Sequence, residues 1–468
     1  MVFYNLTGEI PDFLFVVKNL FVMEFYANIL SEILLKRGNS MREDKLKLRR
    51  KIYRLVAEHA KKLDNLQDVY SAVMDSVGED ISRAEAEARV RAALGTFEKG
   101  EIPKEVDFPF ISVIEKACDR KDENCGCHMS CEPGAIRMDE KGKPAIDIDK
   151  CLSCGLCIIA CPEGAITDKT EIAQTIDLIK KHKRVYAVLA PAFAGQFGPD
   201  VSEEQIKTAL LMLGFYDVLE VALGADMITV KEAEEFLRRM DRGDKFMITS
   251  CCCPPFVRMA KGYRPKIAGL VSDSVSPMVA IARFIKAEDE NAKVVFIGPC
   301  IAKKTEAKLP ELKDAVDCVL TFEELSAIFE AYKIELEKLE VKMPMTDASH
   351  DGRIYGHTGG VSTAIITSIK SLRPNTKVNA RHGNGIKECK QILDAVELGT
   401  LEANFVEGMA CIGGCVGGPG KLVDPEEGAR AVDEFAQKSG VKEAVANNAA
   451  NILFRKYKDR VKLESLKM

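Results

Sequence analysis

The sequence predicts an α/β fold in which parallel sheets are flanked by helices, preceded by a smaller α+β unit and a helical N-terminal region. Three short apolar runs, 185–189, 245–248 and 294–297, alternate with helical segments, and each ends at a small-residue or proline turn. Continuous apolar runs of this kind are typical of buried strands in parallel sheets. Cysteine motifs directly follow two of the runs. They are therefore expected at the carboxyl ends of strands, where open α/β sheets build their binding sites.

Residues 1–100 are expected to form the helical region. Between 41 and 97 the segment is highly charged, with apolar residues such as Ile52 and Val56 at helical spacing and no cysteine. We interpret it as a solvated helical bundle that caps or docks the following domain, in preference to a ligand-binding unit. The apolar stretch 11–35 contains charged residues, so we predict an amphipathic helix or a poorly ordered extension and expect no membrane span.

Composition limits the classes of function. A chain of 468 residues, 47% hydrophobic, can form two to four domains. A formal charge of -5 gives no reason to expect nucleic acid or an anionic membrane as partner. The 16 cysteines, without a secretory signal pattern, argue against an oxidising compartment, so a reducing cytoplasm is the expected location.

The α+β unit is expected at residues 101–172 and is rich in cysteine. Its second half, Cys151-x2-Cys154-x2-Cys157-x3-Cys161-Pro162, has the spacing of a bacterial two-cluster ferredoxin, in which the fourth cysteine serves the other 4Fe-4S cluster. The segment 131–136 resembles 161–166, so Cys131 and Cys161 occupy equivalent crossing positions. The predicted ligands are Cys118, Cys125, Cys127 and Cys161 for cluster one, and Cys131, Cys151, Cys154 and Cys157 for cluster two.

The first half of this unit is irregular, which leaves Cys118 the weakest of these assignments. His128 could coordinate iron, although a polar surface histidine is the simpler interpretation. Zinc is the alternative for the unit as a whole, but the spacing fits 4Fe-4S clusters better.

Three further cysteine segments lie far apart in the sequence. They are Cys251-Cys252-Cys253 before Pro254, Pro299-Cys300 before Ala302-Lys303-Lys304, and Met409-Ala410-Cys411 with Cys415 four residues on. If the fold brings them to one point, four thiolates there suit an iron-sulfur cubane. Scattered buried cysteines or zinc ligands are the alternative, but zinc sites usually pair their ligands locally.

These segments resemble the three signature segments of iron-iron (FeFe) hydrogenases, in the same order, and the resemblance runs from about residue 110 to the low 420s. It implies a two-lobed catalytic domain over 173–425, with a metal centre between the lobes. Residues 426–468 are then expected to form a C-terminal helical segment that packs on this domain.

The resemblance also implies a six-iron H-cluster, a 4Fe-4S cubane joined through one cysteine sulfur to a two-iron unit that carries carbon monoxide, cyanide and a bridging dithiolate amine. The family ligand directly precedes proline, so the implied cubane ligands are Cys253, Cys300, Cys411 and Cys415, the last one bridging. The implied contacts to the two-iron unit come from Lys303, whose ammonium would hold a cyanide, and from Met409, Ala190 and Pro191.

A proton path is implied as well. Cys252 is predicted to pass a proton, although a small buried hydrophobe is the plainer interpretation of a free thiol. Cys251 has no matched role and is interpreted as packing. Glu232, Glu235 and Arg239 share one helical face, which by itself would be a solvated charged face, and these three residues and Ser272 match the family's path.

The resemblance therefore predicts a cytoplasmic enzyme that interconverts protons, electrons and hydrogen. The expected partners are a ferredoxin or similar soluble electron carrier and the hydrogenase maturation proteins. Two alternatives stay open: an iron-sulfur carrier or assembly protein without the two-iron unit, and a hydrogen sensor. Gly298 and Met278 stand where methionine and glutamine are commonest in the family, so catalytic bias is not fixed by the resemblance.

Overall fold

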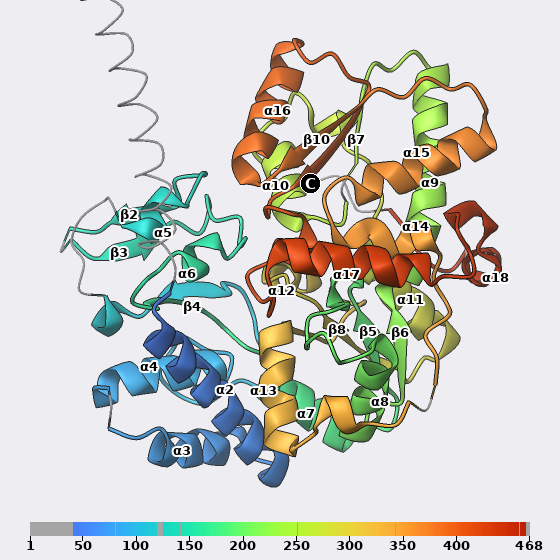
Figure 1. Cartoon of the computed structure of the whole chain (residues 1–468). Coiled ribbons are helices and arrows are strands. Elements are labelled where there is room, and N and C mark those ends of the chain that lie inside the picture. Colours follow the sequence, from blue (N-terminus) through green and yellow to red (C-terminus); the bar gives the residue numbers. More distant parts are fainter. Residues whose placement is uncertain are drawn as a thin grey trace, which may run out of the picture.

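The computed structural model describes residues 41–79, 81–118, 125–140, 142–249, 251–341, 343–457 and 459–464. The stretch 11–35, predicted as an amphipathic helix or an extension, lies outside these residues. Within them, two parallel sheets flanked by helices confirm the predicted α/β fold (Figure 1). No helix among the described residues has the length and apolar character needed to cross a membrane.

The first sheet has the strand order β6-β5-β8-β9, and all its strands are parallel. The predicted runs 185–189 and 294–297 form its two central strands, β5 and β8, whose side chains are almost all buried. The strands are β5 (Val185–Leu189), β6 (Asp217–Glu220), β8 (Lys293–Ile297) and β9 (Cys318–Leu320). The helices of this lobe are α7 (Ile172–Lys181), α8 (Glu203–Leu213), α11 (Pro277–Glu288), α12 (Ala302–Ala307) and α13 (Phe322–Tyr332).

The second sheet has the order β10-β11-β7 and is also parallel. The predicted run 245–248 contributes only a two-residue strand, β7, while β11 forms the centre. The strands are β7 (Met247–Ile248), β10 (Ala380–Asn384) and β11 (Phe405–Met409). The helices of this lobe are α9 (Val221–Asp241), α10 (Pro254–Lys261), α15 (Gly360–Leu372) and α16 (Ile386–Leu398).

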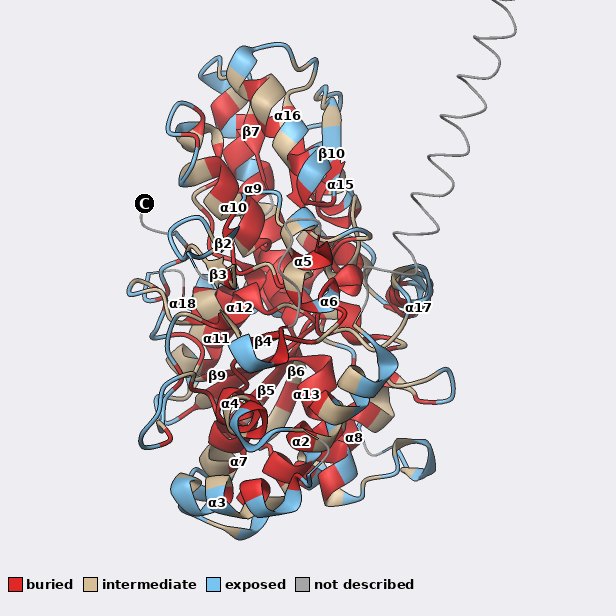
Figure 2. Cartoon of the chain, turned by 90° about the vertical axis from the view of Figure 1, so that its left-hand side faces the viewer, coloured by how far each residue is buried: buried red, intermediate tan, exposed pale blue. Residues whose placement is uncertain are grey.

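The C-terminal helices lie against both lobes. In Figure 1, α17 (Pro425–Gln437) runs across the front of the molecule between the two sheets. The short helix α14 (His350–Arg353) contacts α17, and α18 (Asn448–Tyr457) contacts α9 and α11. Figure 2 shows buried residues around the strands of the first sheet, whereas strand β10 of the second sheet is largely exposed.

The cysteine-rich unit contains two antiparallel strand pairs, β1 with β4 and β2 with β3. Its elements are β1 (Ile111–Val113), α5 (Gly126–Met129), β2 (Ile136–Met138), β3 (Pro144–Ile146), α6 (Leu156–Ile159) and β4 (Ile166–Asp168). The internal repeat is visible in its hydrogen bonds, since the amide of Ala135 donates to Cys131 Sγ at 3.2 Å and that of Ala165 donates to Cys161 Sγ at 3.3 Å. Cys131 and Cys161 thus have the same local geometry.

The N-terminal helices α2 (Glu43–Lys62), α3 (Leu66–Ser76) and α4 (Arg83–Ala93) form a three-helix unit. The α3 and α4 helices begin at Asn65 and Ser82, whose side chains accept hydrogen bonds from the first-turn amides. Ile52 and Val56 of α2 are buried in one continuous apolar core with strand β5 and helix α13. The unit therefore packs directly on the first lobe.

Candidate active site

The three signature segments begin where parallel strands end. Cys251–Cys253 follow β7, Cys300 follows β8, and Cys411 follows β11. Because β8 belongs to the first sheet and β7 and β11 to the second, the segments meet between the two lobes. The amide of Ala410 in the third segment donates to Cys253 Sγ in the first at 3.4 Å, which joins two of them directly.

Four thiols gather at this point. Burial raises the pKa of Cys300 to about 11, and the nearby Cys253 adds to the shift. Burial also raises the pKa of Cys415 to about 12, with further contributions from Cys300 and Cys253. Burial likewise raises the pKa of Cys411, and the charges of Cys300, Cys253 and Cys415 add to the shift. Buried thiols that disfavour one another's ionisation need a cation to hold them as thiolates, and an iron cluster supplies that charge. The predicted cubane ligands thus fit such a cluster.

The cysteines of the α+β unit form two further groups. Burial is the main cause of the raised pKa values of Cys151, Cys154 and Cys157, and each of the three also senses Cys131. Cys154 senses Cys300 as well, so this group lies beside the four thiols of the signatures.

The other group contains Cys125, Cys127 and Cys161. Cys127 Sγ lies 3.5 Å from Cys125 Sγ, and a hydrogen bond from Cys127 lowers the pKa of Cys161 to about 6. Cys118 is buried in the same apolar cluster. The division of these eight cysteines between two clusters stays a prediction from the internal repeat, and His128 is partly exposed beside Cys127.

A small cavity next to Cys415 contains most of the other residues predicted to hold the cofactor. Ala190, Pro191, Cys252 and Lys303 line it, together with Val221, Ala225, Pro277, Met278, Phe296, Tyr355 and Cys415. Apart from the thiols, the lysine and the tyrosine hydroxyl, the walls are apolar. Met409 is buried at the end of β11, where its carbonyl accepts a hydrogen bond from the amide of Gly385 at 2.8 Å.

Lys303 is the buried cation of this cavity. Its ammonium lies 2.6 Å from Glu306 Oε2. Burial alone lowers the pKa of Lys303, but Glu306, followed by Cys300 and Cys252, raises it above its ordinary value. The side chain therefore carries its charge into an apolar space, where an anionic ligand would be strongly attracted.

Among the predicted proton-path residues, hydrogen bonds join Ser272, Glu235 and Arg239. Ser272 Oγ donates to Glu235 Oε2 at 2.8 Å, and Arg239 Nε donates to Glu235 Oε1 at 2.8 Å. Arg239 also donates to the carbonyls of Gly269 and Val271. At the inner end, burial raises the pKa of Glu232 to about 7, a hydrogen bond from Thr249 lowers it, and the charge of Glu235 adds to the rise. Glu232 Oε1 is buried without a hydrogen-bond partner.

The two free thiols of the triplet lie in different surroundings. Cys252 lines the cavity with Lys303 and Cys415. The pKa of Cys251 is raised by burial and then by the charge of Glu232. Cys251 was interpreted from the sequence as packing, whereas the structure places its thiol against the first carboxylate of the path.

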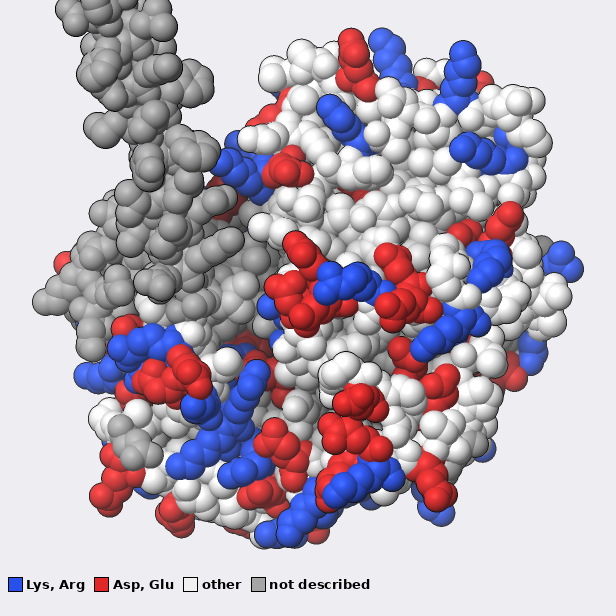
Figure 3. All heavy atoms as spheres, in the orientation of Figure 1, with Lys and Arg blue, Asp and Glu red and all other residues white. Residues whose placement is uncertain are grey.

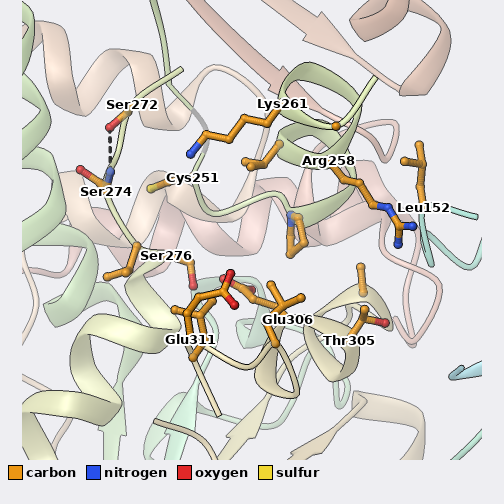
Figure 4. A pocket seen from close by; sticks show the side chains of 17 residues that line it. Leu152, Cys251, Arg258, Lys261, Ser272, Ser274, Ser276, Thr305, Glu306 and Glu311 are labelled. Carbon is orange, nitrogen blue, oxygen red and sulfur yellow. Dashed lines mark hydrogen bonds between the residues drawn. The ribbon is translucent and has the colours of Figure 1, made fainter. Parts of the chain in front are cut away.

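Cys251 also borders a second cavity of about 370 Å³ (Figure 4). Ser272, Ser274 and Ser276 line one side of it, with the amide of Ser274 donating to Ser272 Oγ at 3.2 Å. The side chain of Lys261 extends into the cavity from α10, and Glu306 and Glu311 face it from the opposite wall (Figure 4). One member of the predicted path, Ser272, thus lines a space large enough for several water molecules.

Sequence reasoning missed three side chains of this site. The hydroxyl of Thr249 donates a short hydrogen bond to Glu232 Oε2, Glu306 holds the Lys303 ammonium, and Tyr355 lines the cavity and hydrogen-bonds with Thr229 Oγ1 at 2.8 Å. Thr249 lies two residues before the cysteine triplet and Glu306 two residues after Lys304, so their closeness to the signatures was a signal that could have been used. Tyr355 has no motif around it.

Comparison with known proteins identifies the family. The model of the iron-only hydrogenase large subunit, C-terminal domain, matches residues 183–419, and a 4Fe-4S binding domain matches residues 143–166. Iron hydrogenase 1 of Clostridium pasteurianum is 30% identical over 385 residues, which is 62% of this chain and 67% of that protein. Cytosolic Fe-S cluster assembly factor NAR1 of Meyerozyma guilliermondii is 24% identical over 238 residues, 42% of this chain and 45% of that protein.

The fold has solved counterparts. The FeFe-hydrogenase HydA1 of Chlamydomonas reinhardtii superposes with a TM-score of 0.53 at 23% identity, covering 62% of this chain and 94% of the other. The matched region of the family model contains the signature cysteines and the strands that carry them. This chain therefore belongs to the family defined by the C-terminal domain of iron-only hydrogenase large subunits.

Proposed function

We propose that the protein is a hydrogenase that catalyses the reversible reaction 2 H+ + 2 e- to H2. The observation that carries the proposal is the cavity next to Cys415, which a buried ammonium, Lys303, and a free thiol, Cys252, line together. An iron-sulfur carrier needs the four cubane thiols but needs neither of these groups. A cavity equipped with a cation and a proton donor suits a cofactor that has anionic ligands and exchanges protons.

In this proposal Cys253, Cys300, Cys411 and Cys415 hold the cubane, and Lys303 holds a cyanide of the two-iron unit. The H-cluster, when bound, would supply iron that exchanges electrons with hydrogen and an amine that exchanges protons. The apolar walls formed by Val221, Phe296 and Met278 exclude water from this site. Ala190, Pro191 and Met409 complete the support of the two-iron unit.

The proton route starts at Cys252, the free thiol on the cavity wall. Glu232, with its pKa near neutrality, can both accept and release a proton at working pH. The route continues from Ser272 to Glu235 and Arg239, which lie on α9 toward its exposed end. Thr249 orients the Glu232 carboxylate through its hydroxyl.

Electrons would pass through the two 4Fe-4S clusters of the α+β unit. The charge of Cys300 contributes to the raised pKa of Cys154, so the two sites lie near one another, as electron transfer between clusters requires. We expect a ferredoxin or similar soluble carrier as donor, maturation proteins that install the two-iron unit, and a cytoplasmic location.

A carrier or assembly role is the second candidate, favoured by the similarity to the assembly factor NAR1. One experiment separates the two. Protein isolated anaerobically is assayed for iron and by infrared spectroscopy, with and without maturation. The hydrogenase gains bands of metal-bound carbon monoxide and cyanide together with hydrogen evolution. Protein that holds its cubanes and shows neither after maturation would be a carrier.

A further inference from the structure

A buried cluster of charges joins three parts of the chain that are distant in sequence. Arg49 comes from helix α2 of the N-terminal unit, Asp168 from strand β4 of the cysteine-rich unit, and Lys304 from helix α12 of the second signature. Glu323 and Glu324 of α13 complete it. All five side chains are buried, and Asp168, Lys304 and Glu324 are fully so.

Asp168 is the centre of this charge cluster. Its Oδ1 accepts from Arg49 Nη2 at 2.7 Å, and its Oδ2 accepts from Lys304 Nζ at 2.9 Å. One carboxylate thus serves two cations from two different units, one with each oxygen. Since charges attract strongly in the low-dielectric interior, the position of each cation depends on the other through Asp168.

The two cations are held by further contacts. Arg49 Nε donates to Glu323 Oε2 at 3.0 Å, while Lys304 Nζ donates to Glu324 Oε1 at 2.5 Å and to the carbonyl of Lys169 at 2.7 Å. Arg49 is also stacked over the ring of Tyr53, 4.8 Å from its centroid. Lys304 therefore has its three donors directed at three fixed acceptors, which is a rigid anchor for the helix that carries it.

Lys304 is adjacent in sequence to Lys303, the cation of the cofactor cavity. Successive residues of an α-helix point about 100° apart, so the rotation of α12 that satisfies Lys304 also decides where the Lys303 ammonium lies. An anchor on one side of this six-residue helix thus sets the geometry of the functional side chain on the other.

The charge cluster is not needed merely to attach the N-terminal unit. Helix α2 already shares a continuous apolar core with α13 and β5, which supplies the attachment. A buried ion pair is weak evidence for stability because desolvation offsets most of its attraction, and its better-supported role is to fix one arrangement among several. Figure 3 shows exposed charges of both signs on the surface. Ion pairs among such exposed side chains contribute little to stability, so they are not comparable with this buried cluster.

We propose that Arg49 is a positioning residue for the site: the N-terminal helical unit fixes helix α12, and with it Lys303, through the shared carboxylate of Asp168. This gives a function to a unit to which the sequence assigned only a capping role. The inference rests on the proposed function for the task of Lys303, but the coupling from Arg49 to α12 is a property of the polypeptide alone.

The test compares Arg49→Met with Arg54→Met, a control in the same helix whose partner is Glu58 in an exposed pair. Amide hydrogen exchange is measured first, on protein that holds its cubanes but has not received the two-iron unit. Arg49→Met should speed exchange in the peptide covering 302–307 by about 10-fold or more, while the remote helix α16 is unchanged and Arg54→Met matches wild type.

After maturation, Arg49→Met should keep the iron content of wild type but show shifted or broadened cyanide bands, because the ammonium that holds the ligand is displaced. Wild-type exchange in α12 together with wild-type cyanide bands would overturn the inference, as would equal effects in both variants. If Arg49→Met does not accumulate, Arg49→Lys decides. One ammonium cannot reach both Asp168 and Glu323 as a guanidinium does, so an intermediate effect is expected, and wild-type behaviour refutes the coupling.

The two proposals fail separately. Wild-type protein without carbon monoxide and cyanide bands after maturation would refute the hydrogenase. The exchange measurement on the unmaturated protein would still show whether Arg49 controls α12.

Discussion

Glu232→Gln should remove the pH dependence that the buried carboxyl of Glu232 gives to the free energy of unfolding. Burial raises the pKa of Glu232 from 4.5 to about 7. At 1.36 kcal/mol for each pH unit, this difference corresponds to about 3 kcal/mol that opposes ionisation in the folded state. The direction of the pH dependence follows because the pKa of Glu232 is higher in the folded state than in the unfolded state. The contribution of the neutral carboxyl to the unfolding free energy is fully present below pH 4.5 and is lost as the pH rises through about 7.

Two measurements check this reasoning. The unfolding free energy of wild type, relative to that of Glu232→Gln, should fall by about 3 kcal/mol between pH 4.5 and 7 and stay level above. In matured protein, hydrogen evolution should fall by about 10²-fold or more in the variant, the scale expected when a positioned acid or base is removed.

The matched control is Glu234→Gln, on the same helix but in an exposed pair with Arg238. It should leave both quantities unchanged. A carboxyl band in infrared difference spectra should mark the proton on Glu232 at pH 6 and be absent from Glu232→Gln. Stability curves of wild type and Glu232→Gln that run parallel over this pH range would show that the carboxyl is ionised throughout, and the relay assignment would lose its basis.

Three further predictions concern the metal site. Lys303→Ala should hold three cubanes but lose the two-iron unit or hold it weakly. The control, Lys313→Ala, changes an exposed lysine and should keep the two-iron unit. Normal carbon monoxide and cyanide bands in Lys303→Ala would contradict the role of the ammonium. Cys252→Ala should keep its iron and infrared bands while turnover falls by about 10²-fold, and Cys253→Ala should lose the cubane. Cys251→Ala should also lose turnover because its thiol contacts Glu232, and full turnover in this variant would return Cys251 to a packing role. The control is Cys318→Ala, which changes a buried cysteine outside the site. Cys118→Ala should reduce the iron content of cluster one, and an unchanged iron count would show that another residue completes that cluster.

The sequence was informative where local chemistry decides the structure. Apolar runs such as 185–189 became the central strands of the first sheet because a parallel strand buried on both faces has to be apolar throughout. Strand β11 was not identified, although it forms the centre of the second sheet, because Glu407 interrupts its apolar run. In the fold that carboxylate is fully buried and accepts the amides of Gly359 and Ser362 at 2.8 Å each, at the start of α15. A distant helix terminus thus supplies the compensation, and no local pattern reveals it.

The cysteine triplet shows the same limit at the scale of single side chains. Its residue types and its proline identify a metal ligand, but they cannot tell which way each neighbouring thiol faces, because the surroundings come from α9, from α12 and from the third signature. The fold turns Cys252 toward Lys303 and Cys415 and turns Cys251 toward Glu232. Two adjacent thiols thus face a carboxylate on one side and the cavity beside Cys415 on the other. The departure at Gly298 has an equally non-local reason, since a Cβ there would lie 2.8 Å from the Cβ of Ala190, a residue that follows strand β5 and lines the cavity.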